Sequence, residues 1–104
     1  MKIISVTELQ SLLAAGAVTL LDVRGADELD LASLAAAQHI PLHELPQRSG
    51  ELDKAAPIAV LCHHGGRSEM AARFLEKNGF SDVANVTGGI DAWSLQVDPG
   101  VPRY

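Results

Sequence analysis

The chain has 104 residues, a net charge of −5 at pH 7 and a single cysteine, Cys62. A hydrophobic fraction of 47% with 20% charged residues is typical of a globular domain and argues against a disordered chain. The acidic balance argues against nucleic acid or an anionic membrane as the main partner, and no apolar run approaches the roughly 20 residues of a membrane span. The first residues lead into Glu8 and Gln10 rather than into a signal-peptide core, so we expect a cytoplasmic protein.

The first third of the chain predicts a helix followed by a strand. Thr7 is expected to cap the helix, with Gln10 reaching back to it, and Gly16 fits the position after the last turn. Residues 18–23 form a short apolar run rich in β-formers, which indicates a strand buried on both faces.

The middle of the chain predicts only short elements. Residues 26–37 suit a short helix without a clear cap, and residues 39–42 are expected to be extended because of their proline. Residues 43–52 are expected to hold one or two helical turns, interrupted by Pro46 and Gly50.

The second half of the chain alternates between strands and helices. Strands are predicted at 58–61 and 83–86, and helices from about 67 or 68 to 78 and from 90 to about 95. The apolar face of the longer helix is predicted to consist of Met70, Ala71, Phe74 and Leu75, with Gly79 ending the helix. The tail, residues 97–104, contains two prolines and cannot be a regular helix.

This alternation predicts one α/β domain over residues 1–104, with a mostly parallel central sheet flanked by helices on both faces. In such sheets, binding sites form beyond the carboxyl ends of the strands. Cys62 follows the predicted strand 58–61 directly, so it is expected at such an end.

The segment Cys62-His63-His64-Gly65-Gly66-Arg67-Ser68 is the most informative stretch for function. The two glycines let successive backbone N–H groups point inward, and the helix that follows adds unpaired N–H groups and the positive end of its dipole. With the charge of Arg67, this environment favours the thiolate form of Cys62 and stabilises an anion bound near its sulfur. The segment therefore predicts a nucleophilic cysteine beside an anion site.

Less specific interpretations of these residues remain open from composition alone. Cys62 could be a buried small hydrophobe, and His63 and His64 could be surface histidines without a catalytic task. Zinc is disfavoured because consecutive ligands rarely converge on one ion and no second cysteine exists, so we expect neither a metal nor a cofactor.

Five other positions have more ordinary predicted roles. Asp22 and Arg24 are expected to form a buried polar pair that holds a strand to the loop, although they could also help to shape the site. The Gly88-Gly89 pair is expected to allow a tight turn, and Trp93 is expected to belong to the core.

Several motifs in this order resemble the single-domain rhodaneses, or rhodanese-like sulfurtransferases. The resemblance rests on Asp22-Val23-Arg24 with Glu28, on the segment from Cys62 to Ser68, on Ala71-Ala72, Leu75, Gly79-Phe80, Val83 and Val86, and on Gly88-Gly89 before Ala92-Trp93. It covers nearly the whole chain and implies a rhodanese-like fold. Cys62 and Arg67 would then be catalytic, and His63, His64, Gly65, Gly66 and Ser68 would bind the substrate.

The resemblance implies sulfur transfer from thiosulfate or a related donor to a thiol or cyanide through a persulfide on Cys62. The alternative is a persulfide-carrying relay module whose partner is a cysteine desulfurase or a sulfur-carrier protein. The tail is similar to the ending of rhodanese domains fused behind adenylyltransferases that serve such carriers, although packing on the body would also explain it. Phosphatase or arsenate reductase action is disfavoured because those relatives have a longer loop between cysteine and arginine than the four residues here.

Overall fold

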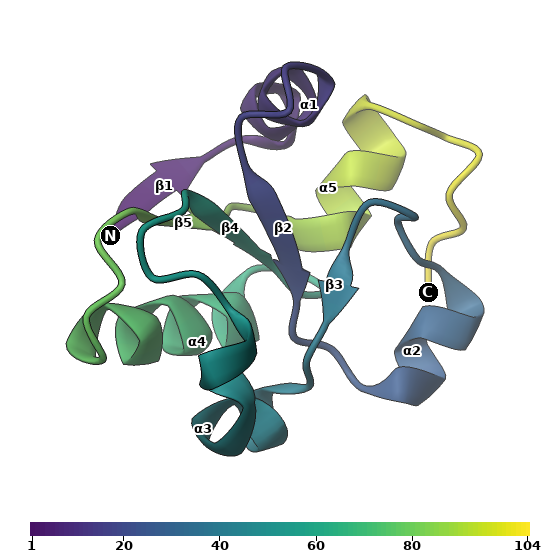
Figure 1. The fold of residues 1–104 in the computed structure, drawn as a ribbon. Coiled ribbons are helices and arrows are strands. Elements are labelled where there is room, and N and C mark those ends of the chain that lie inside the picture. Colours follow the sequence, from purple (N-terminus) through teal and green to yellow (C-terminus); the bar gives the residue numbers. More distant parts are fainter.

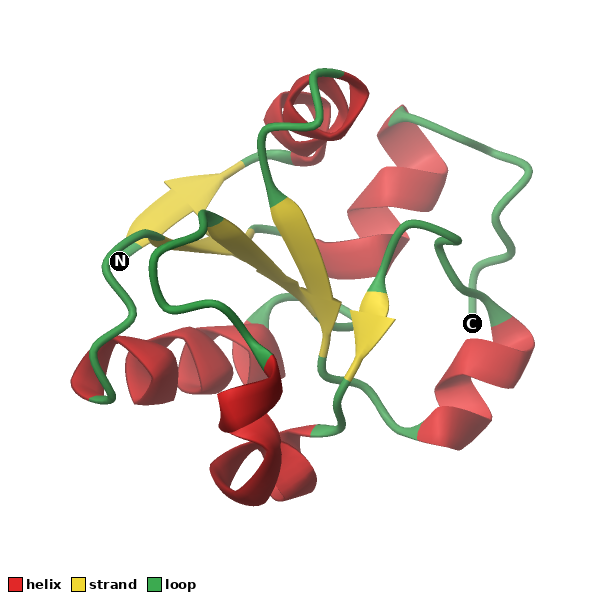
Figure 2. Ribbon diagram, in the orientation of Figure 1, coloured by secondary structure: helices red, strands yellow, loops and turns green.

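The computed structural model describes all residues from Met1 to Tyr104 and places one parallel sheet between two layers of helices (Figures 1 and 2). The sheet has five strands in the order β1-β5-β4-β2-β3, and all neighbours are parallel. The strands are β1 (Lys2–Ile4), β2 (Thr19–Asp22), β3 (Gln38–His39), β4 (Ile58–Leu61) and β5 (Val83–Val86). The prediction of an α/β domain with a parallel sheet is therefore confirmed.

The helices connect these strands in chain order. They are α1 (Val6–Ala14), α2 (Ala26–Leu31), α3 (Leu45–Arg48), α4 (Gly66–Lys77) and α5 (Gly89–Gln96), and 3-10 turns at Leu42–Glu44 and Ser49–Glu51 flank α3. None of these helices is long and apolar enough to cross a membrane.

The strands divide the apolar side chains between two cores because successive side chains point to opposite faces of the sheet. On β4, Ile58 and Val60 pack with the residues of α3 and α4, whereas Ala59 and Leu61 pack with those of α1 and α5. Cys62 continues the first set and joins the core beneath α4. This alternation directs the thiol toward the helix that follows it.

The start of the chain differs from its prediction in two ways. Ser5 rather than Thr7 caps α1: the Ser5 hydroxyl accepts the Glu8 N–H at 3.1 Å, and the Glu8 carboxylate accepts the Ser5 N–H at 3.2 Å. Strand β1 was not predicted, because three residues with only Ile4 buried are too few to show a periodicity. Gly16 lies beyond the last turn of α1 with φ +63°, as expected.

Two side chains also depart from their predicted roles. Met70 was predicted on the buried face of α4 but is 62% exposed. Ala72 is buried there instead, so the apolar stripe lies about one position further along the helix. Pro46 does not interrupt a helix but stands in the first turn of α3, where its missing N–H costs nothing. Trp93 packs against the core of α1 and α5 but is only partly buried.

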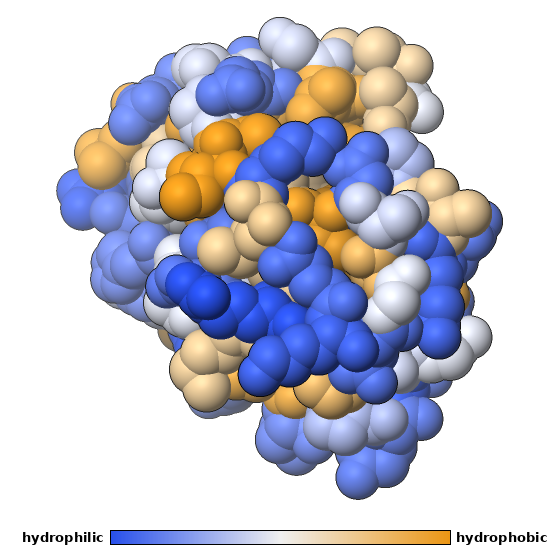
Figure 3. Space-filling view, turned by 90° about the vertical axis from the view of Figure 1, so that its left-hand side faces the viewer, coloured by the Kyte–Doolittle hydropathy of each residue, from blue (hydrophilic) through white to orange (hydrophobic).

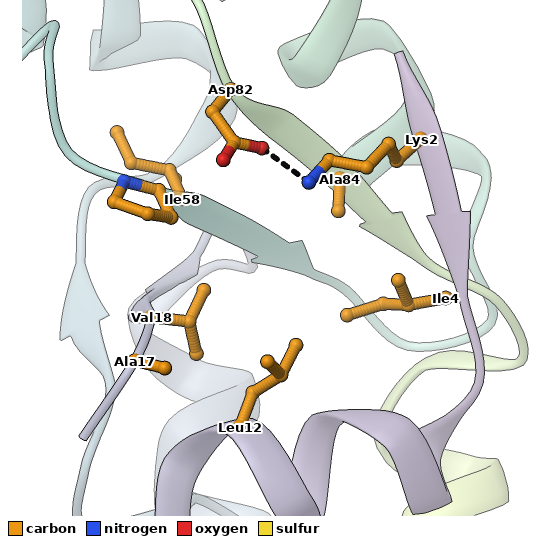
Figure 4. A pocket seen from close by; sticks show the side chains of 9 residues that line it. Lys2, Ile4, Leu12, Ala17, Val18, Ile58, Asp82 and Ala84 are labelled. Carbon is orange, nitrogen blue, oxygen red and sulfur yellow. Dashed lines mark ion pairs between the residues drawn. The ribbon is translucent and has the colours of Figure 1, made fainter. Parts of the chain in front are cut away.

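A small apolar pocket lies at the amino ends of the strands (Figure 4). It is lined by Ile4, Leu12, Val18 and Ile58, among others, and the ion pair between Lys2 and Asp82 lies at its edge. On the side of the molecule that carries the N-terminus, hydrophobic atoms form separate patches among hydrophilic ones (Figure 3). The pocket is at the opposite edge of the sheet from Cys62 and plays no part in the site described next.

Candidate active site

The candidate site lies at the carboxyl edge of the sheet, where Cys62 leaves β4 and enters a loop that becomes α4. Gly65 has φ +118°, a backbone conformation that favours glycine, and Gly66 is the first residue of α4. The first N–H groups of α4 have no carbonyl partner within the helix, so this loop ends on a set of free donors. The loop and the free helix N-terminus are those predicted for an anion site.

The Cys62 sulfur is buried, with 1% of the residue exposed, and it is held by two polar contacts. The Gly65 N–H donates to Sγ at 3.0 Å, and Sγ lies 3.3 Å from the hydroxyl oxygen of Ser68. Ser68 is fixed in turn by Asn85 on β5, since the two side chains are 2.5 Å apart and Asn85 also donates to the Gly65 carbonyl at 3.2 Å. The Cys62 thiol thus contacts hydrogen-bonding groups on one side, although the residue belongs to an apolar core.

The first turn of α5 supports this loop from behind. The N–H groups of Ile90 and Asp91 donate to the carbonyls of Cys62 and His63 at 2.9 and 3.2 Å. A Cβ atom at Gly89 would collide with both carbonyl oxygens, and Gly89 has φ +57°. The Gly88-Gly89 pair therefore does more than make the predicted tight turn, because it lets the backbone of α5 touch the backbone of the cysteine loop.

Arg67 is paired rather than free. Its two terminal nitrogens donate to the two carboxylate oxygens of Glu28 on α2, at 2.5 and 2.9 Å. The hydrogen bonds with Glu28 raise the pKa of Arg67, and the negative charge of Glu28 adds to this effect. The positive charge of Arg67 that was expected beside Cys62 is present, but it is paired with the Glu28 carboxylate.

Glu28 should remain ionised well below its ordinary pKa of 4.5, because its hydrogen bonds with Arg67 lower that pKa to about 2. The pair then adds stability that is fully present above pH 4.5 and is lost as the pH falls toward 2. A carboxyl ¹³C titration by NMR checks this. An Arg67→Gln variant should bring the midpoint back toward the ordinary value, and a midpoint near 4.5 in the unmodified protein would contradict the pairing.

The two histidines of the loop form an aromatic stack with the last residue of the tail. The His63 ring is stacked between those of His64 and Tyr104, with centroids 3.8 and 3.9 Å away. Ligand atoms of His63, His64 and Asp91 lie within 4.8 Å of one another, a set that would suit zinc by type. Asp91 is already paired with Arg103 at 2.9 Å, so we assign this group to the support of the loop rather than to a metal.

Asp22 and Arg24 form the predicted buried pair beneath the site. Both side chains are fully buried, and Arg24 donates to the Asp22 carboxylate through Nε and Nη2, the shortest contact being 2.7 Å. Arg24 also donates to the carbonyl of Ala32 at 2.9 Å and to the hydroxyl of Tyr104 at 2.9 Å. The pair thus ties β2 to α2 and to the tail.

The structure brings together all seven residues predicted from the loop, Cys62 to Ser68. It adds three that sequence reasoning did not assign to the site: Glu28, Asn85 and Tyr104. Glu28 was visible as part of the first motif, but nothing in its spacing pointed to Arg67, which is 39 residues away. Asn85 offered one signal, a polar residue in a strand that is otherwise buried and apolar.

Comparisons with known families and solved structures identify the fold. The rhodanese-like domain matches residues 5–96, which is most of the chain. The chain belongs to the rhodanese-like domain family. A rhodanese-related protein from Thermoplasma volcanium has the same fold, with a TM-score of 0.87, 35% identity and full coverage of both chains.

Two relatives of this rhodanese-like domain carry functional names. The thiosulfate sulfurtransferase GlpE of Pseudomonas fluorescens is 36% identical over 84 residues, which are 81% of this chain and 76% of that protein. The putative sulfur carrier protein YrkF of Bacillus subtilis is 43% identical over 77 residues, 74% of this chain but 42% of that protein. The chain spans less than half the length of the first curated relatives that it matches. A rhodanese sulfur-transfer role is supported by these relatives.

Proposed function

We propose that this protein is a rhodanese-type sulfurtransferase that moves a sulfane sulfur from thiosulfate or a related donor to a thiophilic acceptor. The observation that carries the proposal is the Cys62 sulfur, which accepts the Gly65 N–H at 3.0 Å inside a loop that ends on the free N–H groups of α4. The similarity to the thiosulfate sulfurtransferase GlpE supports it. Neither half of the reaction requires a metal or a cofactor.

In the first half-reaction, the Cys62 thiolate attacks the outer sulfur of thiosulfate. A bond forms between Sγ and that sulfur, the sulfur–sulfur bond of thiosulfate breaks, and sulfite leaves with the bonding electrons. The product is a persulfide on Cys62. The free N–H groups at the start of α4 and the charge of Arg67 stabilise both the bound anion and the terminal sulfur of the persulfide.

In the second half-reaction, an acceptor attacks the terminal sulfur of the persulfide. Cyanide takes this sulfur as thiocyanate, and a thiol takes it as a new persulfide, while the Cys62 thiolate leaves and is ready for another donor. Ser68 holds the sulfur side of the loop through Asn85, and His63 and His64 follow Cys62 directly in the same loop. We assign Cys62 and Arg67 to catalysis and the rest of the loop to binding.

Incubation with thiosulfate should add the mass of one sulfur atom to the intact protein. Oxidation of Cys62 to a sulfinic acid adds nearly the same mass, and dithiothreitol removes the persulfide sulfur but not the sulfinic oxygens. Intact-protein mass spectrometry before and after dithiothreitol therefore separates the two products. If no sulfane donor gives a dithiothreitol-sensitive adduct, the proposal is wrong.

The similarity to a putative sulfur carrier favours a second candidate, a relay module with little turnover on small molecules. In that case, Cys62 receives its sulfur from a cysteine desulfurase and passes it to a sulfur-carrier protein, in keeping with a thiol held reduced in the cytoplasm. Loading rates distinguish the two functions. Faster loading by a desulfurase persulfide than by thiosulfate at equal concentration supports the relay, and the reverse supports the enzyme.

A further inference from the structure

The tail ends beside the cysteine loop, although the reaction proposed above does not use it. It leaves α5, crosses the surface and ends near α2 (Figure 1). Val101 packs against the core of α1 and α5, and the Arg103 guanidinium donates to the Asp91 carboxylate at 2.9 Å. These contacts hold the tail on the body and deliver Tyr104 to the site.

Tyr104 contacts the site through both its ring and its hydroxyl. The ring lies 3.9 Å from that of His63 at an angle of 12°. The hydroxyl accepts a hydrogen bond from Arg24 at 2.9 Å and lies 2.6 Å from Oε2 of Glu28. Because a phenol has a single proton and Arg24 can only donate, that proton is donated to Glu28.

This hydrogen bond helps to fix the Glu28 carboxylate in the position where it pairs with Arg67. Its Oε2 receives Tyr104 and one nitrogen of Arg67, while its Oε1 receives the other nitrogen and the N–H of Gly25 at 3.2 Å. One N–H of each terminal nitrogen of Arg67 is thus donated to Glu28, and the charge of Arg67 is paired with that of the carboxylate. An anion at Cys62 that takes hydrogen bonds from Arg67 must therefore share it with the negative charge of Glu28.

We infer that Tyr104 is a positioning residue that holds Glu28 against Arg67 and so limits how strongly the Cys62 site attracts anions. In the structure the Tyr104 hydroxyl contacts Glu28, and Glu28 is paired with Arg67. Loss of that hydroxyl, or departure of the tail, weakens the hold on Glu28 and frees Arg67 for an anionic ligand. The inference rests on the proposed function only for the identity of that ligand, a sulfur-donor anion such as thiosulfate.

Alkylation of Cys62 by iodoacetate and by iodoacetamide tests this without any sulfur transfer. The two reagents are of similar size and form the same carbon–sulfur bond with loss of iodide, but one is an anion and the other is neutral. The measured quantity is the rate with iodoacetate divided by the rate with iodoacetamide. Differences in thiol exposure and ionisation affect both rates alike and cancel, so this ratio reports how strongly the site attracts the anion. In Tyr104→Phe, which keeps the ring on His63, this ratio should rise by up to about fivefold, the factor for one ordinary hydrogen bond.

Further variants show whether Tyr104 acts through Glu28 and Arg67. Glu28→Gln should raise the ratio at least as much, and adding Tyr104→Phe to it should raise the ratio no further. Arg67→Gln should lower the ratio and abolish the effect of Tyr104→Phe. Arg73→Gln, which removes an exposed charge from the same helix, serves as the matched control and should leave that effect unchanged.

An unchanged ratio in Tyr104→Phe, or a rise that persists in the Arg67→Gln background, would overturn the inference. A purely structural role for Tyr104 would change both alkylation rates alike and leave their ratio constant. Because the readout is alkylation, the result stands even if thiosulfate loads no sulfur, so the inference and the proposed function can fail separately.

Discussion

Replacing Cys62 with alanine should lower the rate of sulfur transfer from thiosulfate to cyanide by at least about 10³-fold. The thiol supplies the only covalent attachment for the sulfur, and removal of an enzyme's nucleophile typically costs this much or more. The measurement is thiocyanate formation at saturating thiosulfate. Since Cys62 is the only cysteine, no other side chain of the chain can take over the persulfide.

The fold should survive this change, because a single buried sulfur is removed from a core of thirteen residues. We expect a loss of about 1 kcal/mol in the free energy of unfolding, measured with urea. Ser94→Ala is the matched control: Ser94 is a small, buried polar side chain on α5 whose hydroxyl donates to the Ile90 carbonyl of the same helix at 3.1 Å, and its loss should leave the rate unchanged. Substantial activity in the folded Cys62→Ala protein would refute a persulfide at Cys62.

Removing one partner of the buried ion pair should give the largest change in stability. Asp22→Ala leaves the Arg24 guanidinium fully buried without its carboxylate, and such an uncompensated charge costs about 3–5 kcal/mol. The free energy of unfolding, from urea denaturation followed by circular dichroism, checks this. For a domain of this size the loss is a large part of the total stability.

A double variant distinguishes the effect of an unpaired charge from the effect of lost packing. Replacing Asp22 with Leu and Arg24 with Met together removes both charges and should recover most of the lost stability. The exposed pair between Arg73 and Glu69 is the control, since Glu69→Ala should cost less than about 1 kcal/mol. If Asp22→Ala costs no more than this exposed pair, Asp22 does not stabilise Arg24 as described.

The fold and the loop could be predicted because their signals are local. The buried strands are short apolar runs bounded by turn residues, and the glycines and arginine after Cys62 stand next to it in sequence. The errors arose where the local signal was weak or ambiguous. Ser5 and Thr7 are both good capping residues three positions before a possible partner, and only the packing of Val6 and Leu9 decides between them.

By itself, the sequence determined the α/β fold with its parallel sheet and placed the single cysteine between a buried strand and a helix N-terminus. Only the tertiary structure decided how Arg67 is held, because Glu28 and Tyr104 are 39 and 76 residues from their partners in the site. Periodicity and spacing report contacts between residues close in the chain. The pair between Arg67 and Glu28 forms because parallel strands gather their carboxyl ends at one edge, and Tyr104 joins it because the tail crosses from α5 to α2. The charge beside Cys62 was thus predictable, and the residues that restrain it were not.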